Sequence, residues 1–154
     1  MAGRPEAAYI SACSEMTEQP ISTTAAAAKA LGHPARLRIL AMLSGGPLCV
    51  CQLTAVLRAA PSTVSEHLRE LRRAGLVAEE KNGKFVFYRP GASRNAVRWL
   101  RVVRASISGD PVAVADVELV ARLRRVPVEV FAASGGRLPA VSSSHARRAI
   151  QSGA

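Results

Sequence analysis

Two cysteine side chains, Cys49 and Cys51, lie one residue apart in the stretch GGPLCVCQL. Thiols this close together are typical of core filling, of a redox pair or of part of a metal site. Inside a helix, residues i and i+2 point about 200° apart and could not share one ion. At a helix N-cap the backbone is not yet helical, so two thiols can converge there, and the helix N-terminus lowers thiol pKa values. Because thiolates select soft ions, the spacing favours ligand binding over the other two interpretations.

Nucleophilic catalysis is the other chemistry that these thiols could serve. Cys49 or Cys51 could act as a nucleophile with His33 or His67 as its base. No activating motif and no Gly-rich cofactor loop accompanies them in the sequence. We therefore expect a protein that is not an enzyme.

A second group of polar side chains lies in the stretch PSTVSEHLRELRRAGL. Pro61 suits the first helical position, Gly75 suits the residue past the end, and Val64, Leu68 and Leu71 share one face at helical spacing. The helix therefore buries that face. The hydroxyl, imidazole and guanidinium side chains that lie outside the apolar stripe are Ser62, Thr63, Ser65, His67, Arg69, Arg72 and Arg73.

The order of these groups predicts a DNA-binding surface. A helix-turn-helix places the start of its second helix at base edges in the major groove, with flanking groups on phosphates. Short hydrogen-bonding side chains begin this helix and arginines follow, as that geometry requires. Two alternatives stay open: Thr63 and Glu66 have the form of a capping box, and His67 could bridge within the domain.

A β-hairpin is predicted directly after this helix. The segments LVAEEK and KFVFYR are joined by Asn82-Gly83, and Asn-Gly between β-prone segments is a strong hairpin signal. Its tip presents Lys81, Asn82 and Lys84, which would lie beside the neighbouring helix. We expect these three side chains to contact DNA.

Composition agrees with a nucleic-acid partner. The chain has 154 residues with 21 Lys+Arg against 11 Asp+Glu, a net charge of +10. The N-terminus lacks the apolar stretch of a signal peptide and no run reaches membrane-spanning length, so we expect a cytoplasmic protein without a membrane partner. An odd number of cysteines, three, in a reducing compartment favours free thiols over a disulfide framework.

The remaining segments complete a mainly α-helical fold with a small β-hairpin, a dimeric winged helix-turn-helix. Helices are expected at Ser22–Leu31, from Pro34, around Leu53–Leu57, from Ser93 to Ile107, and from Pro111 with Asp110 as N-cap. The last of these has Val112, Ala115, Leu119, Leu123 and Val126 as its apolar positions. The expected organisation is a flexible N-terminal arm (1–20), a DNA-binding and dimerisation domain (21–108), a helical extension (109–130) and a disordered tail (131–154).

An apolar seam on the helix from Ser93 to Ile107 predicts how two copies pair. A seam on the last helix of a small domain often packs against a partner, although packing on its own domain is the alternative. We expect pairing through this seam and the helix Ser22–Leu31. The seam consists of Ala96, Trp99, Leu100, Val103 and Ile107.

The segments ALGHPARLRILAML, LCVCQL, STVSEHLRELRRAGLV and NGKFVFYRP together resemble the ArsR/SmtB family of metal-sensing bacterial repressors, over roughly residues 22 to 107. The resemblance implies a homodimer on double-stranded operator DNA, with base reading by Ser62, Ser65 and His67. It also implies that Cys49 stands where the family commonly has a Ser or Thr N-cap, with Gln52 as its capping-box partner.

The LCVC segment resembles the site of arsenite-responsive members and of their cadmium- and lead-sensing relatives. Many arsenite sensors have a third cysteine where this chain has Thr54, and some relatives supply thiols from the N-terminal arm of the other subunit. Cys13 is the remaining candidate, which gives an expected ligand set of Cys49, Cys51 and Cys13. The resemblance implies As(III), or Sb(III), as the inducer. The alternatives are a Cd(II) or Pb(II) sensor, a thiol-redox sensor, or a constitutive DNA-binding protein.

Overall fold

Several helices begin at a residue whose side chain caps them. His33 Nδ1 accepts a hydrogen bond from the backbone N–H of Ala35 and precedes a proline at the first helical position. Ser93 caps the helix that begins at Arg94 by accepting from the backbone N–H of Ala96, and Asp110 accepts from two backbone N–H groups of the following helix. The expected helix starts at Pro34, near Ser93 and at Pro111 are therefore confirmed.

The computed structural model of the protein describes residues 20–137. The elements in chain order are α2 (Pro20–Leu31), α3 (Pro34–Leu43), β1 (Leu48–Cys49), α4 (Val50–Leu57), α5 (Pro61–Arg73), β2 (Val77–Asn82), β3 (Phe85–Pro90), α6 (Arg94–Ile107), α7 (Pro111–Leu123) and α8 (Val128–Ala133). This mainly helical chain with a small antiparallel sheet is the predicted winged helix-turn-helix. Most of the expected arm, with Cys13, and most of the expected tail lie outside the described residues. Among those described, no helix combines the length and apolar character needed to cross a membrane.

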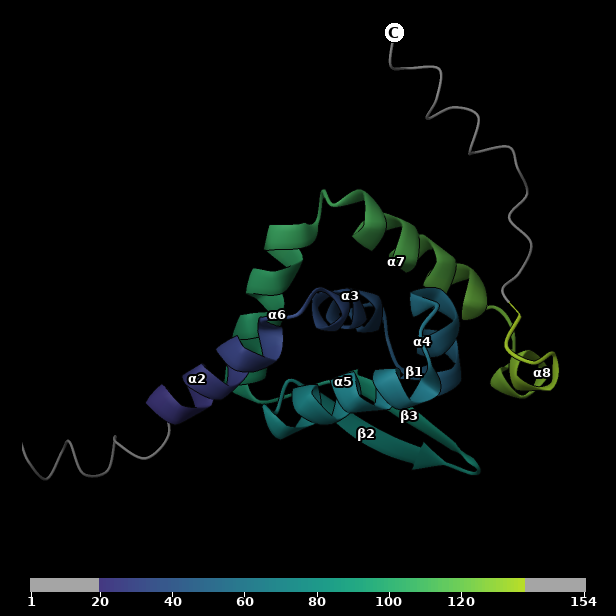
Figure 1. The fold of residues 1–154 in the computed structure, drawn as a ribbon, viewed down its shortest axis with the longest axis horizontal. Coiled ribbons are helices and arrows are strands. Elements are labelled where there is room, and N and C mark those ends of the chain that lie inside the picture. The colour runs from purple at the N-terminus through teal and green to yellow at the C-terminus, as the bar shows by residue number, and fades with distance from the viewer. Residues whose placement is uncertain (1–19, 138–154) are drawn as a thin grey trace, which may run out of the picture.

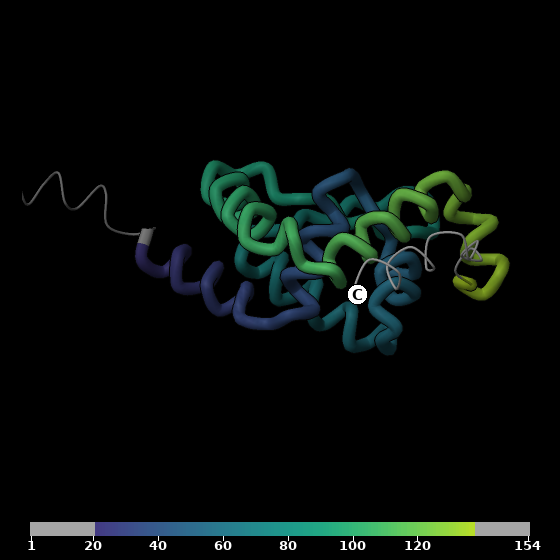
Figure 2. The backbone as a smooth tube through the Cα atoms, turned by 90° about the horizontal axis from the view of Figure 1, so that it is seen from above, coloured from purple at the N-terminus to yellow at the C-terminus, as the bar shows by residue number. Residues whose placement is uncertain are grey.

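The arrangement places α3 at the centre (Figure 1). It contacts α2, α5, α6, α7 and β3, and α5 and the hairpin lie on the side opposite α7. Seen from above, α2 and α8 lie at opposite ends of an elongated body (Figure 2). Helix α5 is thus held by the same central helix that carries the C-terminal extension.

The sheet has three strands in the order β1-β3-β2. Strands β2 and β3 form the predicted hairpin, with Asn82 opposite Phe85 and Gly83 at φ +57°, a left-handed conformation that favours glycine. Strand β1, which no pattern in the sequence predicted, pairs Cys49 with Phe87 of β3. This short pairing attaches Leu48 and Cys49 to the β2–β3 hairpin, which is the wing of the fold.

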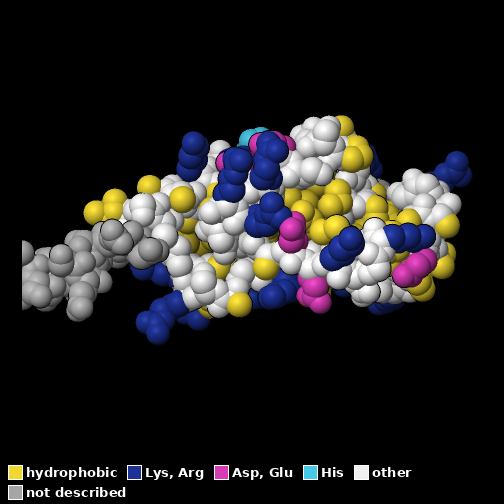
Figure 3. Space-filling view, turned by 90° about the horizontal axis from the view of Figure 1, so that it is seen from below, with side chains coloured by type: hydrophobic (Ala, Val, Ile, Leu, Met, Phe, Trp, Pro, Cys, Tyr) yellow, Lys and Arg dark blue, Asp and Glu magenta, His cyan; other side chains and the backbone are white. Residues whose placement is uncertain are grey.

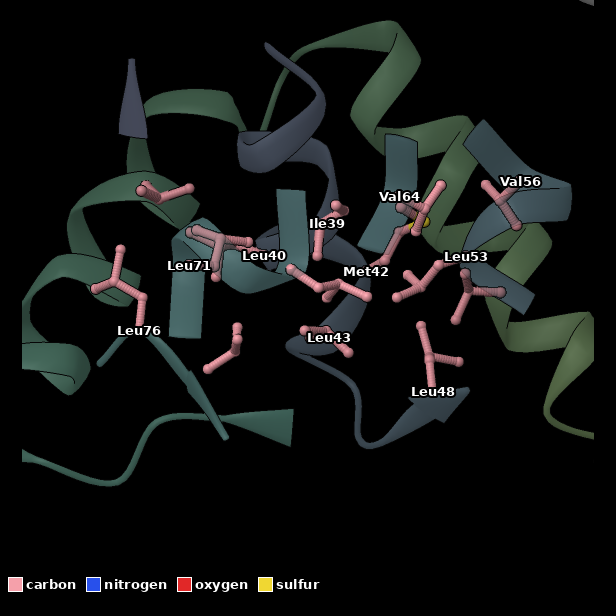
Figure 4. Packing of buried hydrophobic residues seen from close by; sticks show 14 of the residues in the cluster. Ile39, Leu40, Met42, Leu43, Leu48, Leu53, Val56, Val64, Leu71 and Leu76 are labelled. Atoms are coloured by element: carbon pink, nitrogen blue, oxygen red, sulfur yellow. The ribbon is translucent and has the colours of Figure 1, made fainter. Parts of the chain in front are cut away.

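The core is a single apolar cluster around α3. Ile39, Leu40, Met42 and Leu43 are buried to 1% exposure or less. Figure 4 shows Met42 of α3 between Leu53 on one side and Leu71 on the other. Burial of this kind is worth about 1.5–3 kcal/mol per large aliphatic side chain, so the cluster fixes how α4 and α5 sit on α3.

The predicted apolar positions of α7 are partly wrong. Val112 is 51% exposed and Ala115 is also exposed, whereas Asp116 is only 6% exposed. Asp116 accepts two hydrogen bonds from Arg38 of α3, at 2.6 and 2.9 Å. This ion pair turns the helix so that its acidic residue faces inward. The buried positions of α7 are Ala113, Asp116, Val120 and Leu123.

The expected start of the disordered tail, at residue 131, lies inside α8. Phe131 is 2% exposed and belongs to the core cluster, and the helix continues to Ala133. Burial of one aromatic side chain orders a segment whose composition otherwise predicts disorder.

Candidate functional site

Cys49 is both the last residue of β1 and the N-cap of α4. Its backbone is extended (φ −80°, ψ 162°), and its Sγ accepts a hydrogen bond from the backbone N–H of Gln52 at 3.3 Å. Gln52 Oε1 in turn accepts from the backbone N–H of Cys49 at 3.0 Å. The capping box that the family resemblance implied is confirmed, with a thiol sulfur in place of the hydroxyl.

The two sulfur atoms meet at this N-cap. Cys49 and Cys51 form a disulfide, with their Cα atoms 5.4 Å apart. Convergence at a non-helical N-cap is confirmed. The expectation of free thiols is not met in this structure, because the extended backbone at Cys49 brings its sulfur within bonding reach of Cys51. Cys49 is buried, whereas Cys51 is half-buried.

A cleft of about 400 Å³ opens beside Cys51. Its lining is Val50, Cys51, Thr54, Ala55, Pro61, Ala132, Gly135 and Gly136. Thr54 Oγ1 is buried and has no hydrogen-bond partner among the described residues. A buried hydroxyl without a partner loses about 1–3 kcal/mol, and a bound ligand or water can recover that loss. The cleft thus places Cys51, which is bonded to the buried Cys49, and Thr54 beside an apolar wall.

A three-ligand protein site does not occur in the described part of the chain. Between residues 20 and 137, no three His, Cys, Asp or Glu side chains are grouped so that they could hold a metal ion. Cys13, the expected third ligand, lies outside that range. The described site therefore offers two sulfur donors.

The start of α5 presents hydroxyl groups to solvent. Ser62, Thr63 and Ser65 are exposed and make no side-chain hydrogen bond within residues 20–137. The capping box at Thr63 and Glu66 is wrong. The N-cap is Ala60, without a side-chain hydrogen bond, because Pro61 begins the helix earlier and Thr63 lies inside its first turn. The hydroxyls are thus free for an external partner.

The three arginines of α5 lie on the surface, each paired with a carboxylate. Arg69 pairs with Glu66, Arg73 with Glu70 at 2.8 Å, and Arg72 with Glu79 of β2. Figure 3 shows lysine and arginine side chains spread over this lower face, with acidic side chains beside several of them. Exposed pairs contribute about 0–1 kcal/mol, so phosphates can replace these carboxylates at little cost.

His67 lies against the domain itself. Its ring centroid is 4.4 Å from that of His33, at the start of α3. Burial, followed by the charges of His33 and Arg36, lowers the pKa of His67 from its ordinary value. The geometry favours the bridging interpretation of this side chain over a groove contact.

This lowered pKa predicts a pH dependence of stability. As the pH falls below about 6.5, the unfolded chain takes up a proton at His67 before the folded chain does, so the free energy of unfolding decreases. We expect His67→Gln to lose less stability than the parent between about pH 7 and pH 5. Urea unfolding at both pH values measures this. Equal losses for the two proteins would contradict it.

The tip of the β2–β3 hairpin exposes the polar side chains that were predicted there. Lys81, Asn82 and Lys84 are all exposed, and Lys84 Nζ lies 5.4 Å from the ring centroid of Phe85. The tip and the start of α5 are both polar and accessible, as a two-point contact with DNA requires.

The predicted seam on α6 faces the protein's own core. Ala96 and Val103 are 1% and 4% exposed, so they are not available to a partner in this arrangement. Trp99, Leu100 and Ile107 are half-buried and pack against the same core. The predicted apolar stripe is present, and it packs in part on α3 and β3 of the same chain.

A different apolar surface remains on α2 and α6. Ile21 is 87% exposed and Val102 is 49% exposed. Val97, which is 46% exposed, lies on another side of α6, where it lines a separate groove with Leu100 and Arg101. A groove between the two helices is lined by Thr24, Asn95, Arg98, Trp99 and Val102. Trp99 thus contacts both the core and this groove.

Comparison with known proteins gives consistent matches. Residues 33–79 match the family model described as bacterial regulatory protein, arsR family. An uncharacterized HTH-type transcriptional regulator, MJ1325 of Methanocaldococcus jannaschii, is 43% identical over 39% of this chain and 68% of its own length. The arsenical resistance operon repressor of Escherichia coli is 44% identical over 40% of this chain, and the match spans about half, 53%, of that protein. The structure of HlyU from Vibrio cholerae aligns over 60% of this chain and 99% of its own, with 30% identity and a TM-score of 0.54.

Proposed function

The chain belongs to the arsR family of bacterial regulatory proteins, and we propose that it is a transcriptional repressor that binds operator DNA as a homodimer and releases it when As(III) or Sb(III) binds Cys49 and Cys51. The family consists of regulators and not of enzymes. One observation carries the proposal: the two sulfurs converge at the N-cap of α4, the helix directly before α5. A repressor of this kind acts on DNA in the cytoplasm.

The route from the thiols to DNA is short. Cys49 is paired with Phe87 of the wing strand β3, and Cys51 lies in the first turn of α4. Helix α4 packs directly on α5. An ion held by both sulfurs therefore acts on the β2–β3 hairpin and on α5 together. To weaken DNA binding a hundredfold, the ion must bind the DNA-free state more tightly than the DNA-bound state by about 2.7 kcal/mol.

DNA binding through the wing predicts a specific salt effect. Lys84→Ala is expected to weaken binding to all sequences alike and to reduce the slope of log K against log salt by about one unit, because one phosphate contact is lost. Fluorescence anisotropy on a labelled operator between low and moderate salt measures both quantities. Lys84→Arg keeps the charge and serves as the matched control. An unchanged slope in Lys84→Ala would exclude this contact.

Pairing of two copies is proposed through the α2 and α6 surface. The exposed side chains of Ile21 and Val102 and the groove at Trp99 form an area that a second copy would cover. A dimer places two α5 helices at half-sites about one helical turn apart. Sedimentation at micromolar concentration should give the dimer mass, and Val102→Glu should give the monomer mass.

The inducer is tested on the reduced, full-length chain bound to operator DNA. Titration with arsenite, antimonite, cadmium, lead and zinc should release the DNA at the lowest concentration for the trivalent metalloids. If only cadmium or lead releases the DNA, that metal is the inducer and the trivalent metalloids are not. No release by any ion would overturn the proposed sensor.

A thiol-redox response is the second candidate, and the Cys49–Cys51 disulfide favours it. In this case the oxidised chain should bind operator differently from the reduced chain in a buffer that contains a metal chelator. If both forms bind alike, the disulfide carries no signal and the soft-ion function stands alone.

A further inference from the structure

The cleft beside Cys51 is built by two separate parts of the chain. Val50, Ala55 and Pro61 come from the cysteine helix and the start of α5, within the residues that match the family model. Ala132, Gly135 and Gly136 come from α8 and the turn after it, about fifty residues beyond that match. The C-terminal extension therefore supplies one wall of the candidate ligand site.

The extension is fixed in this position by specific contacts. Arg124, at the end of α7, donates hydrogen bonds to the carbonyl oxygens of Met42 at 3.1 Å and Gly46 at 2.7 Å, which tie it to the segment before β1. Phe131 is buried in the core, and Gly136 turns back over its ring at φ +71°. The wall is thus part of the folded domain.

The donor set of the cleft is incomplete for an inorganic ion. Trivalent arsenic forms three bonds, and the described residues supply two sulfurs. The third position faces a lining whose side chains are apolar apart from Thr54 and Cys51. Burial of an apolar substituent on arsenic in such a cleft is favourable. A hydroxyl on arsenic would instead lose its hydrogen bonds to water, and Thr54 is the one hydroxyl of the lining that could replace them.

We propose that this site takes a trivalent organoarsenical, with arsenic on Cys49 and Cys51 and its organic substituent in the cleft against α8. This inference rests on the proposed function and names the ligand class of that site. The extension then acts as the part of the chain that distinguishes an organic arsenical from arsenite.

The chemistry balances with two reactions. A cellular thiol reductant first cleaves the disulfide: one equivalent of disulfide and two of thiol give two cysteine thiols and one oxidised thiol pair. The dihydroxy arsenical R–As(OH)₂ then reacts with both thiols. Two As–S bonds form, two As–O bonds break, and each thiol proton leaves with a hydroxyl as water. The As–C bond and the oxidation state of arsenic do not change.

Binding of phenylarsine oxide and arsenite to the full-length chain tests the proposal. The chain is reduced with a phosphine, which is removed before calorimetry, and the Cys13→Ser variant removes the remaining thiol. We expect phenylarsine oxide to bind this variant at least tenfold more tightly than arsenite, at one per chain by intact mass, because a phenyl group is buried. Phenylarsine oxide should bind the parent chain, which retains Cys13, with the same affinity as it binds the Cys13→Ser variant.

Two neighbouring alanines of α8 provide the matched variants. Ala132 lines the cleft, whereas Ala133 is exposed and does not. Ala132→Leu fills the cleft and should reduce the preference for phenylarsine oxide about tenfold, while Ala133→Leu should leave it unchanged. Thr54→Cys supplies a third sulfur and should shift the preference toward arsenite.

Equal affinities of the Cys13→Ser chain for both arsenicals would overturn the proposal. Equal weakening of both by Ala132→Leu would do the same, since the wall would then have no selectivity. These outcomes concern binding without DNA. If phenylarsine oxide binds selectively but does not release operator DNA, the ligand class stands and the repressor mechanism fails.

Discussion

Replacing either Cys49 or Cys51 with serine is expected to keep operator binding intact and to abolish its release by arsenite. The two sulfurs form one site, so the loss of one leaves a single thiolate that cannot hold the ion across the start of α4. In the parent, arsenite is expected to lower operator affinity about a hundredfold, which corresponds to about 2.7 kcal/mol of coupling free energy. In either variant, arsenite should leave operator affinity unchanged. Fluorescence anisotropy of the operator complex during an arsenite titration measures both binding and release.

The fold of the Cys49→Ser variant should be at least as stable as the parent. Cys49 Sγ accepts the capping hydrogen bond from Gln52, and a serine hydroxyl is the better acceptor at an N-cap. Cys49→Ala removes the cap altogether and should cost about 1 kcal/mol of stability, which separates the structural role from the ligand role. If both serine variants still release operator on addition of arsenite, the thiol pair is not the sensor.

The sequence predicted the thiol site better than its surroundings. The N-cap position of Cys49 followed from the family resemblance, and the non-helical backbone of an N-cap then implied that the two sulfurs converge. The wall of the cleft could not be predicted in this way. Ala132 and Gly136 reach Cys51 only because Phe131 is buried in the core, a tertiary contact that has no local signal.

Local sequence signals such as caps and turn residues predicted where the helices lie. They did not always predict which face of a helix is buried. The hairpin at Asn82 and the cap at Asp110 are encoded within a few residues. Strand β1 is two residues long, too short for an alternating pattern, and it forms because β3 lies beside it. The α6 seam is an apolar stripe that packs in part on the chain's own core, and its pairing with a second copy stays a prediction, since periodicity indicates that a face is buried and not what covers it.

The rotation of α7 is the clearest case of a long-range determinant. Apolar periodicity placed Val112 and Ala115 on the apolar face of this helix, yet both are exposed and the helix buries Asp116, whose partner Arg38 is 78 residues away. An acidic residue within a valine-rich helix was the available signal. It could be interpreted only with the knowledge that α3 turns an arginine toward it.

Removal of that arginine is expected to destabilise the protein more than any surface change. Arg38→Ala leaves the Asp116 carboxylate, whose side chain is 8% exposed, without its two charge-assisted hydrogen bonds. Breaking a buried pair by removing one partner costs about 3–5 kcal/mol. Because the Arg38 side chain is itself 29% exposed, we expect about 3 kcal/mol, the lower end of this range. Urea unfolding at a fixed protein concentration measures it.

The double variant Arg38→Met/Asp116→Leu provides the control for this prediction. It replaces the pair with apolar side chains of similar size and should restore most of the lost stability, since no unpaired charge remains. Arg73→Ala, which breaks the exposed pair with Glu70, should cost less than about 1 kcal/mol. A cost for Arg38→Ala as small as that of Arg73→Ala would mean that the pair does not hold α7 on α3. In that case the extension would need another anchor, and Arg124, with its hydrogen bonds to Met42 and Gly46, is the residue to replace next.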